Sequence, residues 1–166
     1  MLNKSKLLMS AAILAALPAA AQPPAADASL AVGGDVQTRL TLTAADIKAM
    51  PRTTVTVTAE GRDERYEGVL VGEILKRAGA PLGRDLTGAA VATYVVASAK
   101  DGYRAVFSLA ELDPAFTSND VIVADTVDGK PLFGYQGPLR LVAPHDKRGA
   151  RSVRMLQTID VVRLPK

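Results

Sequence analysis

The sequence contains no cysteine and no tryptophan, and its only histidine is His145. Without cysteine, no disulfide can stabilise the fold, and thiolate ligands for zinc, iron–sulfur clusters or molybdenum are absent. A single imidazole also argues against a transition-metal site built wholly from protein side chains. We therefore expect apolar packing to hold the fold together, and we expect no metal to be ligated by the protein itself.

An excess of charge of one sign is also lacking. The chain has 20 basic and 17 acidic residues, and removal of an N-terminal segment with Lys4 and Lys6 would leave 18 and 17, a net charge of +1. Such a balance gives no sequence-wide attraction to nucleic acid, so we expect no nucleic-acid partner. Basic residues are instead concentrated in the C-terminal third.

The longest apolar run lies at the N-terminus and is short. Lys4 and Lys6 precede an apolar stretch over residues 7–17, and small residues follow it as far as Ala21. Because about 20 apolar residues are needed to cross a bilayer, this pattern predicts a secretory signal peptide over 1–21 rather than a membrane anchor. We expect a disordered Pro/Ala-rich tail over 22–34, one domain over 35–166, a periplasmic location and no membrane span in the mature protein.

Short segments of strand-forming residues recur along the chain. They lie at residues 36–42, 53–58, 91–99, 103–107, 121–124, 139–142 and 153–164. Thr43 and Asp46 have the spacing of a capping box at the start of a short helix, a second helix should span 71–78 and end at Gly79, and a helical turn should begin at Ser108. About seven or eight strands to three short helices predict a β-rich α+β domain with a mixed sheet.

A basic segment over residues 144–154 lies between the last two strands, and Arg140 lies just upstream of it. Guanidinium groups bind phosphate oxygens in pairs, so this segment is suited to a phosphate or a similar anion. Charged runs are usually solvated faces, however, and Arg140 and Arg151 are equally consistent with strand-edge cations paired with Asp146 or Asp160. Both interpretations remain open at this point.

Two other kinds of site have weaker support. Ser152, His145 and Asp146 supply the residue types of a hydrolase triad, but no Gly-x-Ser-x-Gly elbow is present and neighbours in one loop rarely have triad geometry. Asp125 and Asp128 lack the ligand spacing of a calcium loop. We expect neither a hydrolase nor a calcium site.

Four stretches of the sequence, taken in order, form a recognisable pattern. They are residues 66–79 with Tyr-Glu-Gly-Val at the start, 99–103 with Asp-Gly-Tyr, 128–132 with Asp-Gly-Lys-Pro-Leu, and 137–154 with Gly-Pro-Leu-Arg at its start and Arg-Ser-Val-Arg at its end. This pattern resembles the molybdopterin-binding oxidoreductase domain of the sulfite oxidase type, particularly its small exported stand-alone members. The resemblance covers residues 50–162 and implies a pterin pocket, with pterin or molybdopterin as the cofactor.

The resemblance also implies roles for individual residues. Arg140 matches an arginine that contacts the cofactor, and Arg151, Ser152 and Arg154 match the segment that holds its phosphate. Asp101 and Tyr103 match a corner near the pterin; without the resemblance they are a turn residue and a core aromatic. The expected cofactor-binding residues are Asp101, Tyr103, Tyr135, Arg140, His145, Arg148, Arg151, Ser152 and Arg154.

One departure from the family's pattern bears on chemistry. The family's enzymes carry a molybdenum-ligating cysteine after the strand that matches residues 55–58, where this chain has Ala59. The methionine thioether is a poor substitute for a thiolate. We therefore expect a periplasmic pterin-binding protein without catalytic residues, used in ligand binding or sensing and handing its bound state to a membrane receptor.

Two alternatives remain open. The first is a molybdopterin-dependent oxidoreductase, in which the dithiolene alone holds molybdenum or a redox partner subunit takes part. The second is a structural or interaction module that binds neither pterin nor metal.

Overall fold

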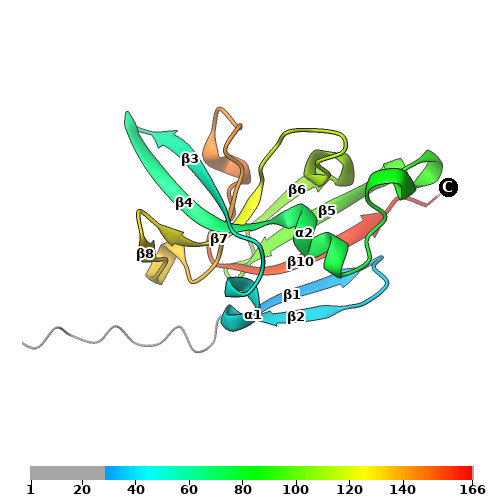
Figure 1. Ribbon diagram of the computed structural model, residues 1–166, viewed down its shortest axis with the longest axis horizontal. Coiled ribbons are helices and arrows are strands. Elements are labelled where there is room, and N and C mark those ends of the chain that lie inside the picture. The colour runs from blue at the N-terminus through cyan, green and yellow to red at the C-terminus, as the bar shows by residue number, and fades with distance from the viewer. Residues whose placement is uncertain (1–28, 166) are drawn as a thin grey trace, which may run out of the picture.

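The computed structural model describes residues 29–165, so the signal peptide predicted over 1–21 lies outside them. Within this part of the chain, ten strands form two five-stranded sheets, accompanied by two short α-helices and several 3-10 turns (Figure 1). The predicted α+β class is therefore confirmed. No helix within residues 29–165 is long and apolar enough to cross a membrane.

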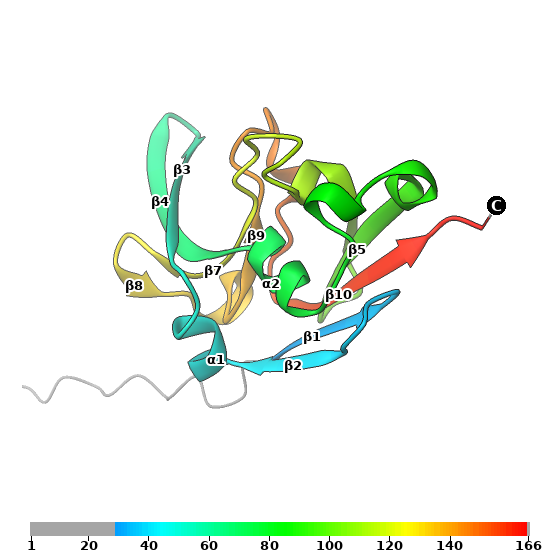
Figure 2. The ribbon, with the colours of Figure 1, turned by 45° about the vertical axis from the view of Figure 1, so that its right-hand side comes forward.

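The first sheet is mixed. In spatial order its strands are β2 (Leu40–Thr43), β1 (Ser29–Gly34), β10 (Leu156–Arg163), β5 (Thr93–Ala99) and β6 (Arg104–Ser108). β1 runs parallel to β10, and every other neighbouring pair is antiparallel. The first and last strands of the described domain therefore lie side by side, as Figure 2 shows.

The sheet begins earlier in the sequence than predicted. Residues 29–34, which we expected within a disordered tail, form β1 with Leu30 and Val32 buried. The strand expected over 36–42 begins only at Leu40. The prediction was wrong because it rested on local composition, whereas β1 is stabilised by hydrogen bonds to β10, whose residues are more than a hundred positions away.

The burial of β5 also differs from the prediction. The apolar run over 91–99 suggested a strand buried on both faces, but in β5 burial alternates along the strand, and residues 88–92 form a 3-10 turn instead. Only one face of this sheet packs on the main core, so alternate residues such as Tyr94 and Val96 remain partly exposed.

The second sheet is antiparallel throughout. Its strands are β3 (Thr53–Ala59), β4 (Arg62–Leu70), β7 (Ile122–Val127) and β8 (Lys130–Pro131), with β9 (Arg140–Val142) also paired with β7. The turn predicted at Gly61 is confirmed. Glu60 and Gly61 have φ values of 52° and 75°, as the tight two-residue loop of a hairpin requires.

The short helices follow the capping signals in the sequence. At α1 (Ala44–Lys48), the Thr43 side chain accepts from the backbone of Asp46 while Asp46 accepts from the backbone of Thr43, so the predicted capping box is present. α2 (Val71–Arg77) is followed by Gly79 at a φ of 74°, as predicted. The capping box predicted at Ser108 opens a 3-10 turn, η3 (Leu109–Leu112).

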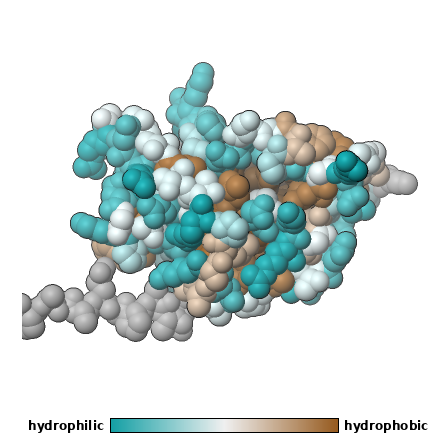
Figure 3. Space-filling view, in the orientation of Figure 1, coloured by the Kyte–Doolittle hydropathy of each residue, from teal (hydrophilic) through white to brown (hydrophobic). Residues whose placement is uncertain are grey.

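Buried apolar side chains form two clusters. The larger cluster includes residues from the first sheet, α2 and the inner face of the second sheet. The smaller one consists of Val55, Tyr66, Ile122, Ala124, Leu132 and Val142. β7 contributes Val123 to the larger cluster and its neighbours to the smaller, so the second sheet is apolar on both faces. On the face seen in Figure 3, hydrophilic residues surround smaller apolar patches.

Candidate anion-binding site

A cavity of about 200 Å³ opens on the surface where turns from the two sheets meet. Its lining residues are Asp101, Tyr103, Tyr135, Gly149, Ala150, Ser152 and Arg154. The first two belong to the turn between β5 and β6, Tyr135 belongs to the 3-10 turn η4 (Gly134–Gln136), and the remaining ones come from η5 (Gly149–Arg151) and the approach to β10. Residues far apart in the sequence therefore share one wall, and several of them were predicted as cofactor-binding.

Arg154 is the cation of this cavity. Its guanidinium carbon lies 4.6 Å from the centroid of the Tyr135 ring, and its Nη1 donates a hydrogen bond to the Tyr135 hydroxyl at 2.7 Å. No carboxylate within residues 29–165 pairs with it, and its buried Nε has no hydrogen-bond partner. A partly buried cation without a carboxylate partner is suited to an anion, because burial strengthens a charge-assisted hydrogen bond.

Two exposed aromatic side chains accompany this cation. Tyr135 is 64% exposed, and Tyr103 is 49% exposed. The Tyr103 hydroxyl donates to the backbone carbonyl of Ala150, which ties the ring to the basic segment, while Asp101 accepts from the backbone N–H of Tyr103 at 3.0 Å. Asp101 is thus the turn residue of the alternative interpretation, but Tyr103 is not a core aromatic.

Arg140 lies behind the cavity rather than in its lining. Its guanidinium carbon lies 4.9 Å from the centroid of the Tyr66 ring, and its Nη1 donates to the Tyr66 hydroxyl at 2.6 Å and to Gln136 Oε1 at 2.8 Å. Burial lowers the pKa of Arg140, and the neighbouring Arg154 cation also acts to lower it. Because a guanidinium keeps its proton in proteins, two like charges stand near one another at this site.

The Tyr66 hydroxyl connects Arg140 to a carboxylate through two hydrogen bonds. It donates to Glu64 Oε2 at 2.6 Å, and burial together with this hydrogen bond raises the pKa of Tyr66 to about 12. Arg140 is therefore linked through a neutral phenol to Glu64, whereas Arg154 has no such link. The sequence did not single out Tyr66 or Glu64, although Tyr66 begins the first stretch of the family pattern.

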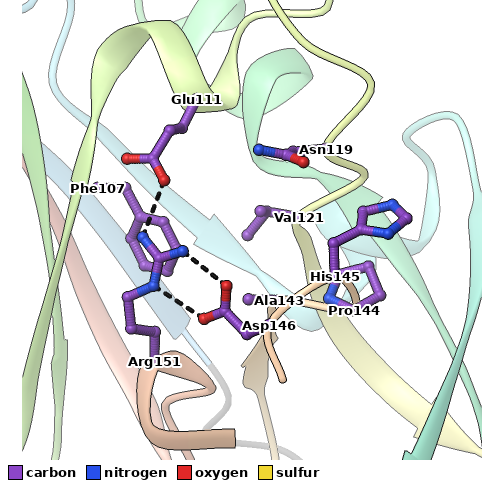
Figure 4. Close-up of a pocket in the computed structure, with 9 residues that line it drawn as sticks. All are labelled: Phe107, Glu111, Asn119, Val121, Ala143, Pro144, His145, Asp146 and Arg151. Carbon is purple, nitrogen blue, oxygen red and sulfur yellow. Dashed lines mark hydrogen bonds and ion pairs between the residues drawn. The ribbon is translucent and has the colours of Figure 1, made fainter. Parts of the chain in front are cut away.

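Arg151 does not line this cavity but a second, smaller one, and there all of its guanidinium nitrogens donate hydrogen bonds to carboxylates (Figure 4). Its Nε and Nη2 donate to the two carboxylate oxygens of Asp146 at 2.8 and 2.6 Å, and its Nη1 donates to Glu111 at 2.9 Å. Its guanidinium carbon lies 4.6 Å from the Phe107 ring centroid. Asp146 and Glu111 raise the pKa of Arg151, so this arginine is part of an ion-pair network, as the alternative interpretation held.

Of the remaining predicted site residues, Ser152 lines the larger cavity, whereas His145 and Arg148 do not. His145 lines a second cavity of about 20 Å³ beside Arg151, which has room for roughly one water molecule. Arg148 is exposed and lines neither cavity. The Ser152 hydroxyl oxygen accepts from the backbone N–H of Ala143 at 3.2 Å, and within the described residues no hydrogen bond joins it to His145. Ser152 and His145 are therefore not joined as members of a hydrogen-bonded triad in this structure.

A family model for the oxidoreductase molybdopterin binding domain matches residues 16–166. The chain belongs to this family. Family membership confirms the resemblance found in the sequence. No curated protein matches the sequence.

Comparison with solved structures gives the same fold. The chain is similar to the crystal structure of the sulfane dehydrogenase SoxCD from Paracoccus pantotrophus, with a TM-score of 0.66 and 21% sequence identity. The match covers 82% of this chain and 38% of that one, so the family member described here spans less than half the length of the dehydrogenase chain.

The residues present fit a pterin better than they fit a protein-ligated metal. The uncompensated Arg154 and two exposed aromatic rings can accept a flat anionic molecule. Within residues 29–165, no group of three or more His, Cys, Asp or Glu side chains could hold a metal ion. Ala59, at the position that the resemblance assigns to the thiolate, is an exposed residue at the end of β3 and does not line the cavity.

Proposed function

We propose that the cavity between the two sheets binds an anionic pterin and that the protein does so without redox chemistry. The observation that carries the proposal is Arg154, a partly buried cation on the cavity wall with no carboxylate partner among the described residues. Membership of the molybdopterin-binding family names the class of ligand, and the absence of cysteine removes the thiolate that would hold molybdenum.

The chemistry of the lining residues supports a division of roles. Aromatic faces at Tyr103 and Tyr135 favour stacking of a flat heterocycle, and Arg154 supplies charge-assisted hydrogen bonds for its anionic end. The Ser152 hydroxyl already accepts a backbone hydrogen bond and retains its own proton to donate. Arg140 adds positive potential from behind the cavity, since it lies close enough to influence Arg154.

We further infer that the protein acts in the periplasm as a ligand-binding or sensing component and passes its bound state to a membrane receptor. The predicted signal peptide over 1–21 supports this location, and the small cavity, without a protein metal ligand among its lining residues, supports binding over turnover. Two exposed tyrosines at the rim leave part of any ligand accessible to a second protein.

A second function has one observation in its favour. The fold is shared with a sulfane dehydrogenase, so a molybdopterin-dependent oxidoreductase remains the alternative, with molybdenum held by the dithiolene alone or with a partner subunit completing the site. This alternative requires the metal in stoichiometric amount, whereas the primary proposal requires a pterin without it.

The deciding experiment is analysis of the full chain purified from a native-like periplasm. Mass spectrometry of the small molecules released on denaturation, combined with molybdenum determination on the same sample, separates the candidate functions. We expect a pterin at near-stoichiometric amount and no molybdenum. Stoichiometric molybdenum would overturn the proposal in favour of the oxidoreductase, and the absence of both, in protein that also fails to bind added pterin-6-carboxylate, would indicate a structural module.

A further inference from the structure

The free edge of β3 is unlike the other sheet edges of this molecule. β3 is seven residues long, is hydrogen-bonded only to β4 among the strands of the described domain, and contains neither a charged residue nor proline. The remaining edge strands are shorter: β2 has four residues, β6 begins with Arg104, β8 consists of Lys130 and Pro131, and β9 has three residues. Proteins normally protect an edge by shortness, charge or proline, and β3 has none of these.

The hairpin fixes which backbone groups of β3 face outward. The two-residue loop at Glu60 and Gly61 is closed by the pair Ala59 and Arg62, which is a hydrogen-bonded pair, and such pairs alternate with non-hydrogen-bonded ones along the ladder. The N–H and C=O groups of Thr54, Thr56 and Thr58 therefore point away from β4. Apart from the ladder with β4, no backbone hydrogen bond from the described chain reaches residues 53–59.

The two faces of β3 differ in a regular way. The side chains of Thr54, Thr56 and Thr58 are exposed, while Val55 is buried in the smaller apolar cluster and Val57 is half-buried against it. The edge thus offers a row of threonines on the solvent side and an incompletely covered aliphatic row on the cluster side. An added strand with the same alternation would continue both rows.

We propose that two copies of this chain pair through the free edges of β3, antiparallel and about a two-fold axis at Thr56. In this register Thr56 faces Thr56 of the second copy, and Thr54 faces Thr58 on either side, so all outward backbone groups of the three threonines are hydrogen-bonded. A two-fold interface of this kind uses the same patch on both copies and closes at a dimer.

The same register is favourable for the flanking side chains. Val55 and Val57 of the two copies face one another as β-branched pairs on the cluster side, which covers the half-buried Val57. β3 itself carries no charged residue, so the pairing places no like charges opposite one another within the ladder. Arg52, just before the strand, is paired with Asp125 of its own copy at 2.6 Å.

Cysteine cross-linking gives a direct test, because the chain has no cysteine of its own. In the proposed dimer the Thr56 Cα atoms lie about 5.5 Å apart, within the range that a disulfide can bridge. Under mild oxidation, the full mature chain carrying Thr56→Cys should convert to a covalent dimer. The matched variant is Thr41→Cys, an exposed threonine on β2, an edge strand of the first sheet, and this variant should remain monomeric. Equal cross-linking of both variants would overturn the proposal.

A charge exchange tests the register. Thr54→Lys with Thr58→Lys places like charges opposite one another twice, whereas Thr54→Lys with Thr58→Glu places opposite charges there. Sedimentation equilibrium from about 1 to about 100 μM should show dissociation constants at least roughly tenfold apart, the first variant being the weaker dimer. Far-ultraviolet circular dichroism and melting curves identify any variant that fails to fold, and Thr56→Cys then decides alone.

The dimer proposal is independent of the pterin proposal. A chain that stays monomeric throughout the concentration series, or Lys and Glu variants of equal dimer affinity, would overturn the pairing of β3 edges. Neither result would affect binding of pterin-6-carboxylate, because no residue of β3 lines the cavity.

Discussion

Arg154 lies over the ring of Tyr135 and donates a hydrogen bond to the hydroxyl of the same residue. The two residues are 19 positions apart and come from η4 and from the approach to β10, so this contact joins turns of the two sheets. It leaves the guanidinium without a counter-ion among the described residues, although burial makes such a charge costly. A ligand that supplies the counter-ion would relieve this cost.

Arg154→Ala should weaken binding of pterin-6-carboxylate by about tenfold or more, because a charge-assisted hydrogen bond contributes about 1.5–3 kcal/mol. Arg154→Lys keeps the charge but loses the planar fork, so its affinity should be intermediate. The measurement is fluorescence titration of the pterin with ligand-free protein.

Arg148→Ala is the matched control for this series, because Arg148 was predicted as a site residue but is exposed and outside the cavity. Its affinity should stay within about twofold of the parent chain. Equal losses in the Arg148 and Arg154 variants would show general attraction by the basic segment instead of a defined site.

Tyr66 should be a late-titrating phenol among the four tyrosines of the chain. Burial and the hydrogen bond to Glu64 raise the pKa of Tyr66 to about 12, so its phenolate should appear about two pH units after an ordinary tyrosine. Because the folded pKa exceeds the unfolded one, the stability from this group is complete below pH 10 and is lost as pH rises toward 12.

Absorbance titration at alkaline pH measures this step directly. Tyr66→Phe should remove the late phase while the earlier phases remain. A late phase that persists in Tyr66→Phe would show that another tyrosine is the buried donor.

Glu111 should make the fold sensitive to acid. Burial acts to raise the pKa of Glu111, but hydrogen bonds from Arg151 and Ser108 outweigh it and hold the pKa below its usual value. A carboxylate of this kind contributes stability that is present above its unfolded pKa and is lost as pH falls through the folded pKa.

Melting temperatures of the parent chain and of Glu111→Gln, measured between pH 7 and pH 3, test this contribution. The glutamine variant should be less stable at pH 7, and its melting temperature should fall less on acidification. Parallel curves for the two proteins would assign the acid sensitivity to other carboxylates.

Gly68 should tolerate no side chain, because an added Cβ would lie 2.0 Å from the backbone oxygen of Val123 on the neighbouring strand. Gly68→Ala must displace β4 from β7 where the ladder already shifts register, and the expected cost is at least about 2 kcal/mol. Gly149→Ala is the control, since a Cβ there meets nothing within 4 Å. Urea unfolding of the two variants measures the difference, and equal stability would contradict the close approach.

Features that depend on local sequence were predictable. The capping boxes at Thr43 and Ser108, the hairpin turn at Gly61 and the helix end at Gly79 each involve residues within a few positions of one another. Their donors, acceptors and backbone angles are set by nearest neighbours, so the spacing of residue types is sufficient to identify them.

Features that depend on distant partners were not predictable. β1 was missed because its partner β10 lies at the other end of the domain. The surroundings of Arg151 and Arg154, two arginines of one motif, were not predictable either. Arg151 is neutralised by Asp146 and by Glu111, which is 40 positions away, while Arg154 has neither. Composition predicted a basic segment, but it could not show which of the two arginines has a carboxylate partner. That depends on the carboxylates that folding brings near.

The cavity wall combines the β5–β6 turn of the first sheet, the η4 turn that follows β8 of the second, and the η5 segment that leads into β10. Both sheets also contribute to the larger apolar cluster. A molecule bound in the cavity would therefore contact turns of both sheets at once and add a bridge between them at the surface, outside the apolar core.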